Sequence, residues 1–281
     1  LPTSGGIHAD NAVLMEPQNR PDVIDQWAIP STTGLESNSL DRSGALDQLP
    51  TFIIERLTHH GASHVLRFPP RTEKPDRFSG GSHTSIINPG LTRKSHNITK
   101  NMVEFAKLRI RIVMDWYKRE GGWPVVGRSK APKIVLEDSA IVKKTLSRVL
   151  SKLRRSHNSH KTPFRWPVGG IEELSKVISA ARVLVYNMTN SNQWEEHLSN
   201  RIAIAGQCAA RGVSTDGLVG YSQPWQPQLT AHDTFDQRGR YQGPRGEVLQ
   251  YLSVALLPGL IEDMRTASVS EINMRRRLLL L

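Results

Sequence analysis

Residues 138–155 read DSAIVKKTLSRVLSKLRR, and this stretch decides the fold that the sequence predicts. Its apolar residues recur at the 3–4-residue spacing of an α-helix and form one stripe: Val142, Leu146, Val149, Leu150 and Leu153. We therefore expect an amphipathic helix from Asp138 to Arg155, with this stripe packed on the rest of the protein.

Another face of the same helix is basic. Lys144, Arg148, Lys152 and Arg155 recur at i, i+4, i+8 and i+11, and no acid interrupts them. A charged helix face is often simply solvated, but like charges aligned in this way repel one another unless a polyanion neutralises them. Residues 128–165 hold eleven Lys and Arg against two acids, a net +9 out of +11 for the chain. This concentration favours binding to a phosphate backbone.

The predicted RNA-binding residues extend beyond that face. A second segment, residues 237–246, interleaves Arg, Gly and one Tyr, as in stretches that adapt to RNA or are simply flexible. The full predicted set is Lys143, Lys144, Arg148, Lys152, Arg154, Arg155, His157, His160, Lys161, Arg165, Arg238 and Arg240.

Composition narrows the class of protein. The chain has 281 residues and a pI near 10.0, which favours an anionic partner. Its single cysteine, Cys208, excludes an intrachain disulfide and a Cys-based zinc site, and we expect a reducing, intracellular compartment, with the mitochondrial matrix as one candidate. No apolar run approaches the ~20 residues of a membrane span, so no transmembrane segment is expected.

Four further helices are predicted, which gives a mostly α-helical fold with about five helices. They span 101–119, about 170–186, 192–211 and 247–257, although 181–186 could instead be a strand. The helix at 101–119 mixes charges of both signs on its outer face, which is typical of a salt-bridged solvent face. We expect these helices to build one core from residue 98 to 265, with an irregular loop at 213–245.

The two ends of the chain lack sustained periodicity. Residues 1–97 are rich in Pro, Gly, Ser and Asn, with one short ordered candidate at Thr51–Leu57 and a short strand at His64–Phe68. We interpret them as an extended arm that a partner's surface would order. The tail at 266–281 ends in three Arg and four Leu, and we expect it to dock on a neighbouring subunit.

The sequence carries no strong signal for catalysis. Residues 122–129, GWPVVGRS, resemble a phosphate-binding loop, but they follow an amphipathic helix where such a loop follows a strand. We interpret them as a linker with an exposed Trp123. His232, Asp233 and Asp236 form a His/Asp cluster in the long loop, and nothing places a nucleophile beside it. A metal site at His59, His60 and His64 is disfavoured without Cys or paired acids, so we expect no catalytic residue, cofactor or metal.

These features together predict a structural RNA-binding component of a large ribonucleoprotein, and an organellar ribosome is the assembly that fits best. High pI, extended arms and missing catalytic motifs occur together in such proteins. A viral nucleocapsid or coat protein that self-assembles around RNA in a virion shares the same features. A nucleic-acid-acting enzyme is the weaker alternative, since it would need acids or a metal near the basic face.

Overall fold

The computed structural model describes residues 46–69, 82–90, 92–186, 200–206, 217–224, 248–263 and 266. These residues contain a five-stranded parallel sheet with helices packed on it. The fold is therefore α/β, and the prediction of a mostly α-helical core was wrong. The strands are β1 (His83–Ile87), β2 (Arg182–Tyr186), β3 (Asn200–Ala205), β4 (Leu218–Gln223) and β5 (Ser253–Leu256).

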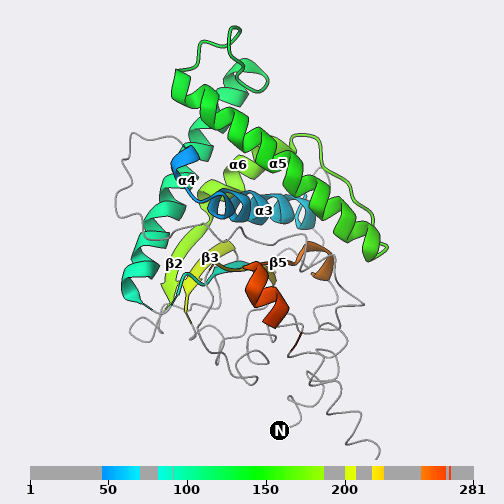
Figure 1. Ribbon diagram of the computed structural model, residues 1–281. Coiled ribbons are helices and arrows are strands. Elements are labelled where there is room, and N and C mark those ends of the chain that lie inside the picture. Colours follow the sequence, from blue (N-terminus) through cyan, green and yellow to red (C-terminus); the bar gives the residue numbers. More distant parts are fainter. Residues whose placement is uncertain are drawn as a thin grey trace, which may run out of the picture.

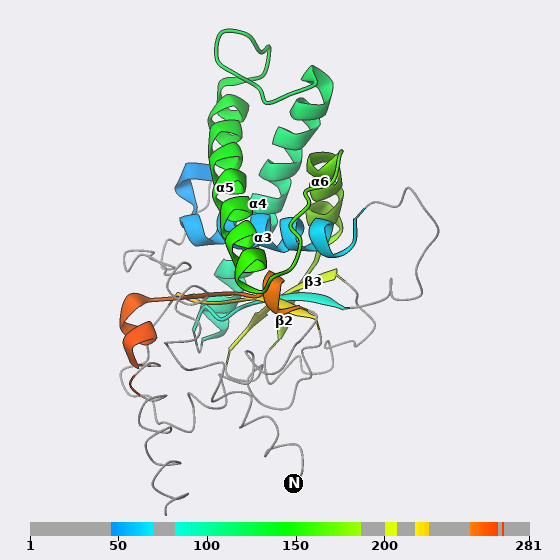
Figure 2. The same ribbon diagram turned by 90° about the vertical axis from the view of Figure 1, so that its right-hand side faces the viewer.

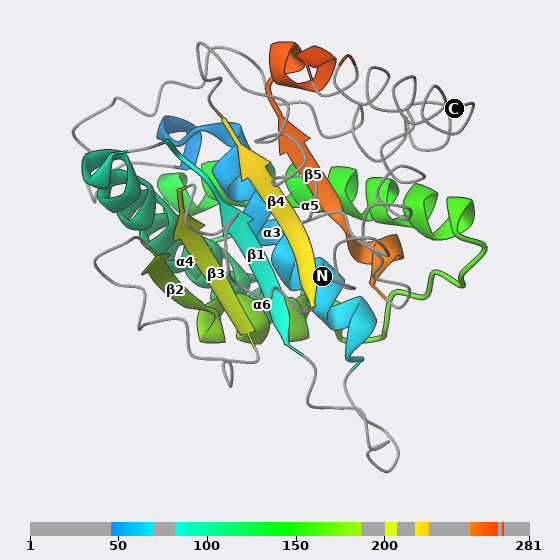
Figure 3. The same cartoon turned by 90° about the horizontal axis from the view of Figure 1, so that it is seen from below.

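The strands lie in the order β2-β3-β1-β4-β5, with β1 at the centre (Figure 3). β1 pairs in parallel with β3 on one side and β4 on the other, and Ile87 lies opposite Ile204 and Ser222. Parallel neighbours require crossover connections. The connection from β1 to β2, which lie on either side of β3, contains three consecutive helices: α4 (Arg93–Glu120), α5 (Lys133–Ser159) and α6 (Gly170–Ala180).

Helices form two layers on one side of the sheet (Figures 1 and 2). α3 (Thr51–Arg67) contacts β1 and β4, whereas α5 packs on α3, α4 and the short helix η5 (Leu249–Tyr251). Figure 2 shows α5 rising from the level of the sheet to the α4–α5 loop, the part of this layer furthest from the strands. α5 is thus an outer helix, and α3 lies between it and the sheet.

The inner position of α3 explains its composition. Its buried residues cover most of the helix circumference, and Ile53 and Leu57 are fully buried. A side chain at Gly61 would place its Cβ 2.5 Å from Leu174 Cδ1 of α6, so the glycine permits close packing of the two helices. α3, β1 and the start of α4 all fall within residues 1–97, so the irregular arm predicted there is wrong for 46–69, 82–90 and 92–97. Residues 1–45 lie outside the described ranges.

The two long helices of the crossover were predicted correctly, although both are longer than expected. α4 begins after Thr92, whose hydroxyl accepts a hydrogen bond from Ser95 N (3.1 Å), and it ends at Gly121 with φ +65°. α5 begins after Pro132 and buries Val142, Leu146, Val149 and Leu153, as the apolar stripe predicted. The short strand predicted at His64–Phe68 is wrong, because α3 runs through Arg67.

The C-terminal half of the predicted fold needs the largest correction. The helix predicted at 170–186 ends at Ala180 and is followed by β2, the alternative that the sequence left open. Strand β3 occupies the middle of the helix predicted at 192–211, and β4 occupies part of the loop predicted at 213–245. The helix predicted at 247–257 is instead η5 followed by β5, and residues 258–263 are helical.

Both faces of the sheet are buried. Ile87, Ile202 and Ile204 face the helices, while Ile86 and Ala203 face a second apolar cluster that includes Leu260 and Ile261. Neighbouring residues along one strand therefore enter different cores, as expected for parallel strands covered on both sides. Within the described part of the chain, no helix is long and apolar enough to cross a membrane.

Candidate nucleic-acid interface

The outer face of α5 is the strongest candidate interface. Seven positions from Lys143 to Arg155 are exposed, and their side chains are only Lys, Arg and Ser: Lys143, Lys144, Ser147, Arg148, Ser151, Arg154 and Arg155. The acid nearest in sequence on the helix, Asp138, points inward and is buried. Five cations therefore share one solvent face with no acid between them, as the sequence predicted for part of this set.

Asp138 shows how the inner face of α5 is fixed. Its Oδ2 accepts a hydrogen bond from Arg109 Nε of α4 (2.6 Å), and its Oδ1 accepts one from Leu46 N (2.7 Å) at the start of the short helix η1 (Leu46–Gln48). This buried contact joins three segments that are distant in sequence. It sets the rotation of α5, and so determines which residues of the helix face solvent.

A carboxylate from α3 lies below one edge of the basic face. Glu55 Oε1 is 2.6 Å from Arg148 Nη2 and 3.9 Å from Lys152 Nζ. The Lys152 side chain is only 11% exposed, against 43% for Arg148. Burial lowers the pKa of Lys152, and the charge of Glu55 opposes that effect. Lys152, a predicted RNA-binding residue, thus faces α3, whereas Arg148 retains an exposed part.

The two predicted histidines help to end the helix. His157 is 2% exposed, and its Nδ1 is 3.1 Å from Pro163 O; its ring packs edge-on against Phe164 and Tyr251. Burial lowers the pKa of His157, which favours the neutral imidazole. His160 Nδ1 is 2.7 Å from Ser156 O within the last turn. His157 is therefore not part of the exposed face.

The residues after α5 are divided between solvent and packing. Lys161 and Arg165 are exposed, as the predicted interface requires. Trp166 packs on the N-terminus of α6, where a Cβ at Gly170 would lie 2.6 Å from the indole ring. Trp123, predicted to be exposed in its linker, is half-buried with its ring 5.1 Å from Tyr117, so that prediction was wrong. Arg238 and Arg240 lie outside the described residues, as do Cys208 and the His232–Asp236 cluster.

Two histidines of α3, His60 and His64, form a cluster with His83, the first residue of β1. The rings of His60 and His64 lie 4.7 and 4.8 Å from that of His83. His60 is held by Ser85 Oγ (2.9 Å) and Asn200 Oδ1 (2.6 Å), and burial lowers its pKa to about 3. Among the described residues, no group of His, Cys, Asp or Glu is arranged to hold a metal ion.

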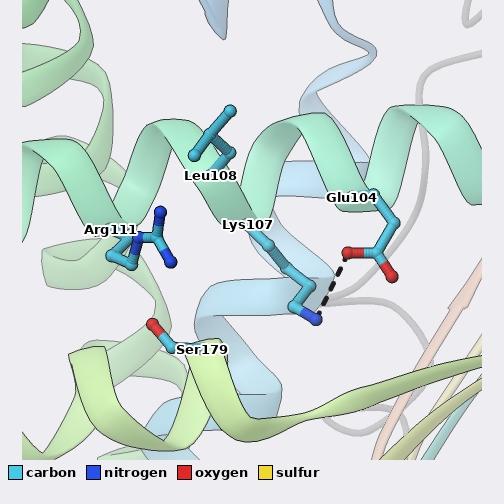
Figure 4. A pocket seen from close by; sticks show the side chains of 5 residues that line it. All are labelled: Glu104, Lys107, Leu108, Arg111 and Ser179. Atoms are coloured by element: carbon cyan, nitrogen blue, oxygen red, sulfur yellow. Dashed lines mark ion pairs between the residues drawn. The ribbon is translucent and has the colours of Figure 1, made fainter.

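A shallow pocket of 290 Å³ lies between α4 and α6 (Figure 4). Glu104, Lys107, Leu108, Arg111 and Ser179 line it. Lys107 Nζ is 3.3 Å from Glu104 and donates a hydrogen bond to Ala181 O (2.6 Å) at the end of α6. The Lys107 ammonium thus gives the Ala181 carbonyl a hydrogen-bond donor at the C-terminus of α6, where positive charge is favourable. This contact gives the pocket a structural explanation.

Sequence reasoning missed Glu55 and the inward turn of Lys152. Glu55 lies 93 positions before Arg148, and no local pattern joins them. The small residues of the outer face, Ser147 and Ser151, could have been found by placing the sequence on a helical wheel.

Comparisons of the chain with family models, with curated proteins and with solved structures found no match.

Proposed function

We propose that this protein is a structural RNA-binding component of a large ribonucleoprotein, of the kind found in organellar ribosomes, and that it contacts the phosphate backbone through α5. One observation carries the proposal: Lys143, Lys144, Arg148, Arg154 and Arg155 are exposed together on an outer helix, and no acid is exposed among them. Such a face attracts a polyanion and releases the counterions condensed on it.

The contacts below this face support the proposal. The inner side of α5 is fixed by buried apolar residues and by the Asp138–Arg109 contact, so the cations project from a rigid element. A rigid scaffold lowers the entropy lost on binding. Glu55 of α3 contacts Arg148, while the other four cations of the face are exposed.

The experiment compares two variants of equal charge. In the first, Lys143, Lys144, Arg148, Arg154 and Arg155 become Gln. In the second, five exposed cations of α4 become Gln: Lys94, Lys100, Arg111, Lys118 and Arg119. Glutamine preserves helix propensity, so both variants should fold. RNA affinity at low salt should fall by more than about tenfold in the α5 variant and much less in the α4 variant. Equal losses would show that only net charge matters.

The mass of the purified particle distinguishes a mixed ribonucleoprotein from a homomeric nucleocapsid or coat, since both could bind RNA through α5. Light scattering with absorbance at two wavelengths gives the number of protein copies and the nucleic-acid content of the purified particle. A single copy that binds RNA weakly alone is expected for one subunit of a mixed assembly. A large homomeric particle that contains RNA would instead identify a nucleocapsid or coat protein. A monomer without RNA affinity would contradict the proposal.

A further inference from the structure

The cations on the outer face of α5 form two rows. Successive residues of an α-helix are rotated by about 100°. Lys144, Arg148 and Arg155 therefore lie along one edge of the exposed face, while Lys143 and Arg154 lie along the other edge. All five are exposed. The two rows run parallel to the helix axis over about 18 Å, at 1.5 Å per residue.

Small side chains occupy the strip between the two rows. Ala140, Ser147, Ser151 and Asn158 point in the intermediate direction and are all exposed. Ser151 Oγ donates a hydrogen bond to Ser147 O at 2.9 Å, so this hydroxyl lies against its own helix. The face is thus a track whose two edges carry charged side chains and whose middle strip carries small ones.

The aromatic rings nearest to this track are engaged in packing. Arg154 lies over the Phe164 ring with its Cζ 5.2 Å from the centroid, and His157 packs against Phe164 and Tyr251. Trp166 packs on Gly170. Proteins that bind single strands stack the bases on open aromatic faces. In the described part of the chain around α5, the rings that could do so already have partners.

We propose that α5 binds a duplex RNA, with one strand of its backbone lying along the helix axis between the two rows of cations, and that it reads no base. This inference rests on the proposed RNA-binding function and specifies the form of RNA. The phosphates of a duplex face outward and its bases face inward, which matches a face that offers charge at its edges and only Ser between them.

The geometry of A-form RNA agrees with this contact. Its major groove is deep and too narrow for a helix, so proteins bind double-stranded RNA through shape, phosphates and 2′-hydroxyls. Binding should therefore depend on strand form and not on sequence.

A bulky neutral residue in the middle strip of the track tests the position of the strand. Ser151→Tyr changes no charge and should weaken binding to a synthetic RNA duplex by about tenfold, which corresponds to about 1.4 kcal/mol. The matched control is Ser179→Tyr at an exposed position of α6, and it should bind as the unchanged protein does. Equal affinities of the two variants would contradict an axial strand.

Strand form and sequence provide the second readout. Two duplexes of unrelated sequence should bind with equal affinity, and each should bind more tightly than its separated strands. Tighter binding of a single strand, or a large preference for one sequence, would overturn the proposal. These results separate failure of the duplex proposal from failure of RNA binding by α5. If only the duplex proposal fails, the five-Gln variant of α5 still loses RNA affinity. If α5 does not bind RNA, that variant keeps its affinity.

Discussion

α3 and α5 are packed on one another, yet they hold their polar groups in opposite ways. α3 buries His59, His60 and Arg56 between the sheet and the outer helices, and all three are at most 2% exposed. α5 exposes five cations over three turns and buries its only inward carboxylate with Arg109. The polar groups of α3 have partners within the fold. The five exposed cations of α5 stay on the surface, where Arg148 contacts Glu55 and Arg154 lies over the Phe164 ring.

This difference separates stability from binding. Arg56 of α3 donates hydrogen bonds to Ser222 Oγ (2.6 Å) and Tyr221 O (3.1 Å), so it fixes α3 on β4. Burial lowers the pKa of Arg56 to about 10, which leaves it charged at neutral pH. A change at such a buried group should lower stability, while a change on the outer face of α5 should alter only the affinity for a partner.

Acid should cause the largest loss of stability, through the histidines that α3 and β1 bury. Burial lowers the pKa of His60 to about 3 and that of His83 well below its usual value, so the folded protein keeps both neutral. Their contribution is complete above about pH 6.5 and is lost as the pH falls toward their folded pKa values, at about 1.4 kcal/mol per pH unit for each. Urea unfolding at pH 7, 6 and 5 measures this slope.

His60→Gln is the matching variant for that experiment. It should lower the free energy of unfolding at pH 7, because Ser85 and Asn200 lose a well-placed partner. It should also reduce the slope of that free energy against pH, because one proton fewer is taken up on unfolding. A slope that is unchanged by the substitution would mean that His60 does not stay neutral in the folded protein.

The inward carboxylate of α5 should matter almost as much as the histidines. Asp138→Ala would leave Arg109 buried without its partner and Leu46 N without an acceptor, which should cost about 3–5 kcal/mol in the free energy of unfolding. Glu137→Ala is the control, since this adjacent carboxylate forms an exposed ion pair with Lys133 (3.7 Å) worth less than about 1 kcal/mol. Similar losses from both would contradict the structural role given to Asp138.

Glu55 joins the two helices and should produce the smallest effect on stability. Glu55→Gln removes the charge that attracts Arg148 and Lys152, at a cost of about 1–3 kcal/mol, because Glu55 and Lys152 are largely buried but Gln keeps an oxygen that can accept a hydrogen bond. RNA affinity should rise, because Arg148 becomes available to phosphate. Glu104→Gln on α4 makes the same charge change away from α5. A fall in affinity in the Glu55 variant would mean that Glu55 positions Arg148 for binding.

The sequence predicted the long helices of the crossover but missed the sheet, apart from the strand left open at 181–186, and the reason is physical. α4 and α5 each have one buried and one solvated face, so their apolar residues repeat with the helical period. The strands are four to six residues long and mostly buried on both faces, so they show no alternation. Polar residues at buried positions, such as Thr84, Ser222 and Ser253, disguise them further.

The candidate site was predictable in part. Lys144, Arg148 and Arg155 were read from their helical spacing, and the structure places all three on the exposed face. Lys152 belongs to the same sequence pattern, but its side chain points toward α3, where its Nζ lies 3.9 Å from Glu55 Oε1. Contacts between segments that are distant in sequence decide such cases, and a helical period alone does not contain them.

The salt dependence of RNA binding tests the central claim most directly. Log K should fall linearly with log salt for the unchanged protein, and replacing the five α5 cations by Gln should reduce the slope by about four, at 0.7–0.9 per lost phosphate contact. The five-Gln variant of α4 should keep the original slope. An α5 variant whose slope equals that of the unchanged protein would show that the outer face of α5 is only solvated.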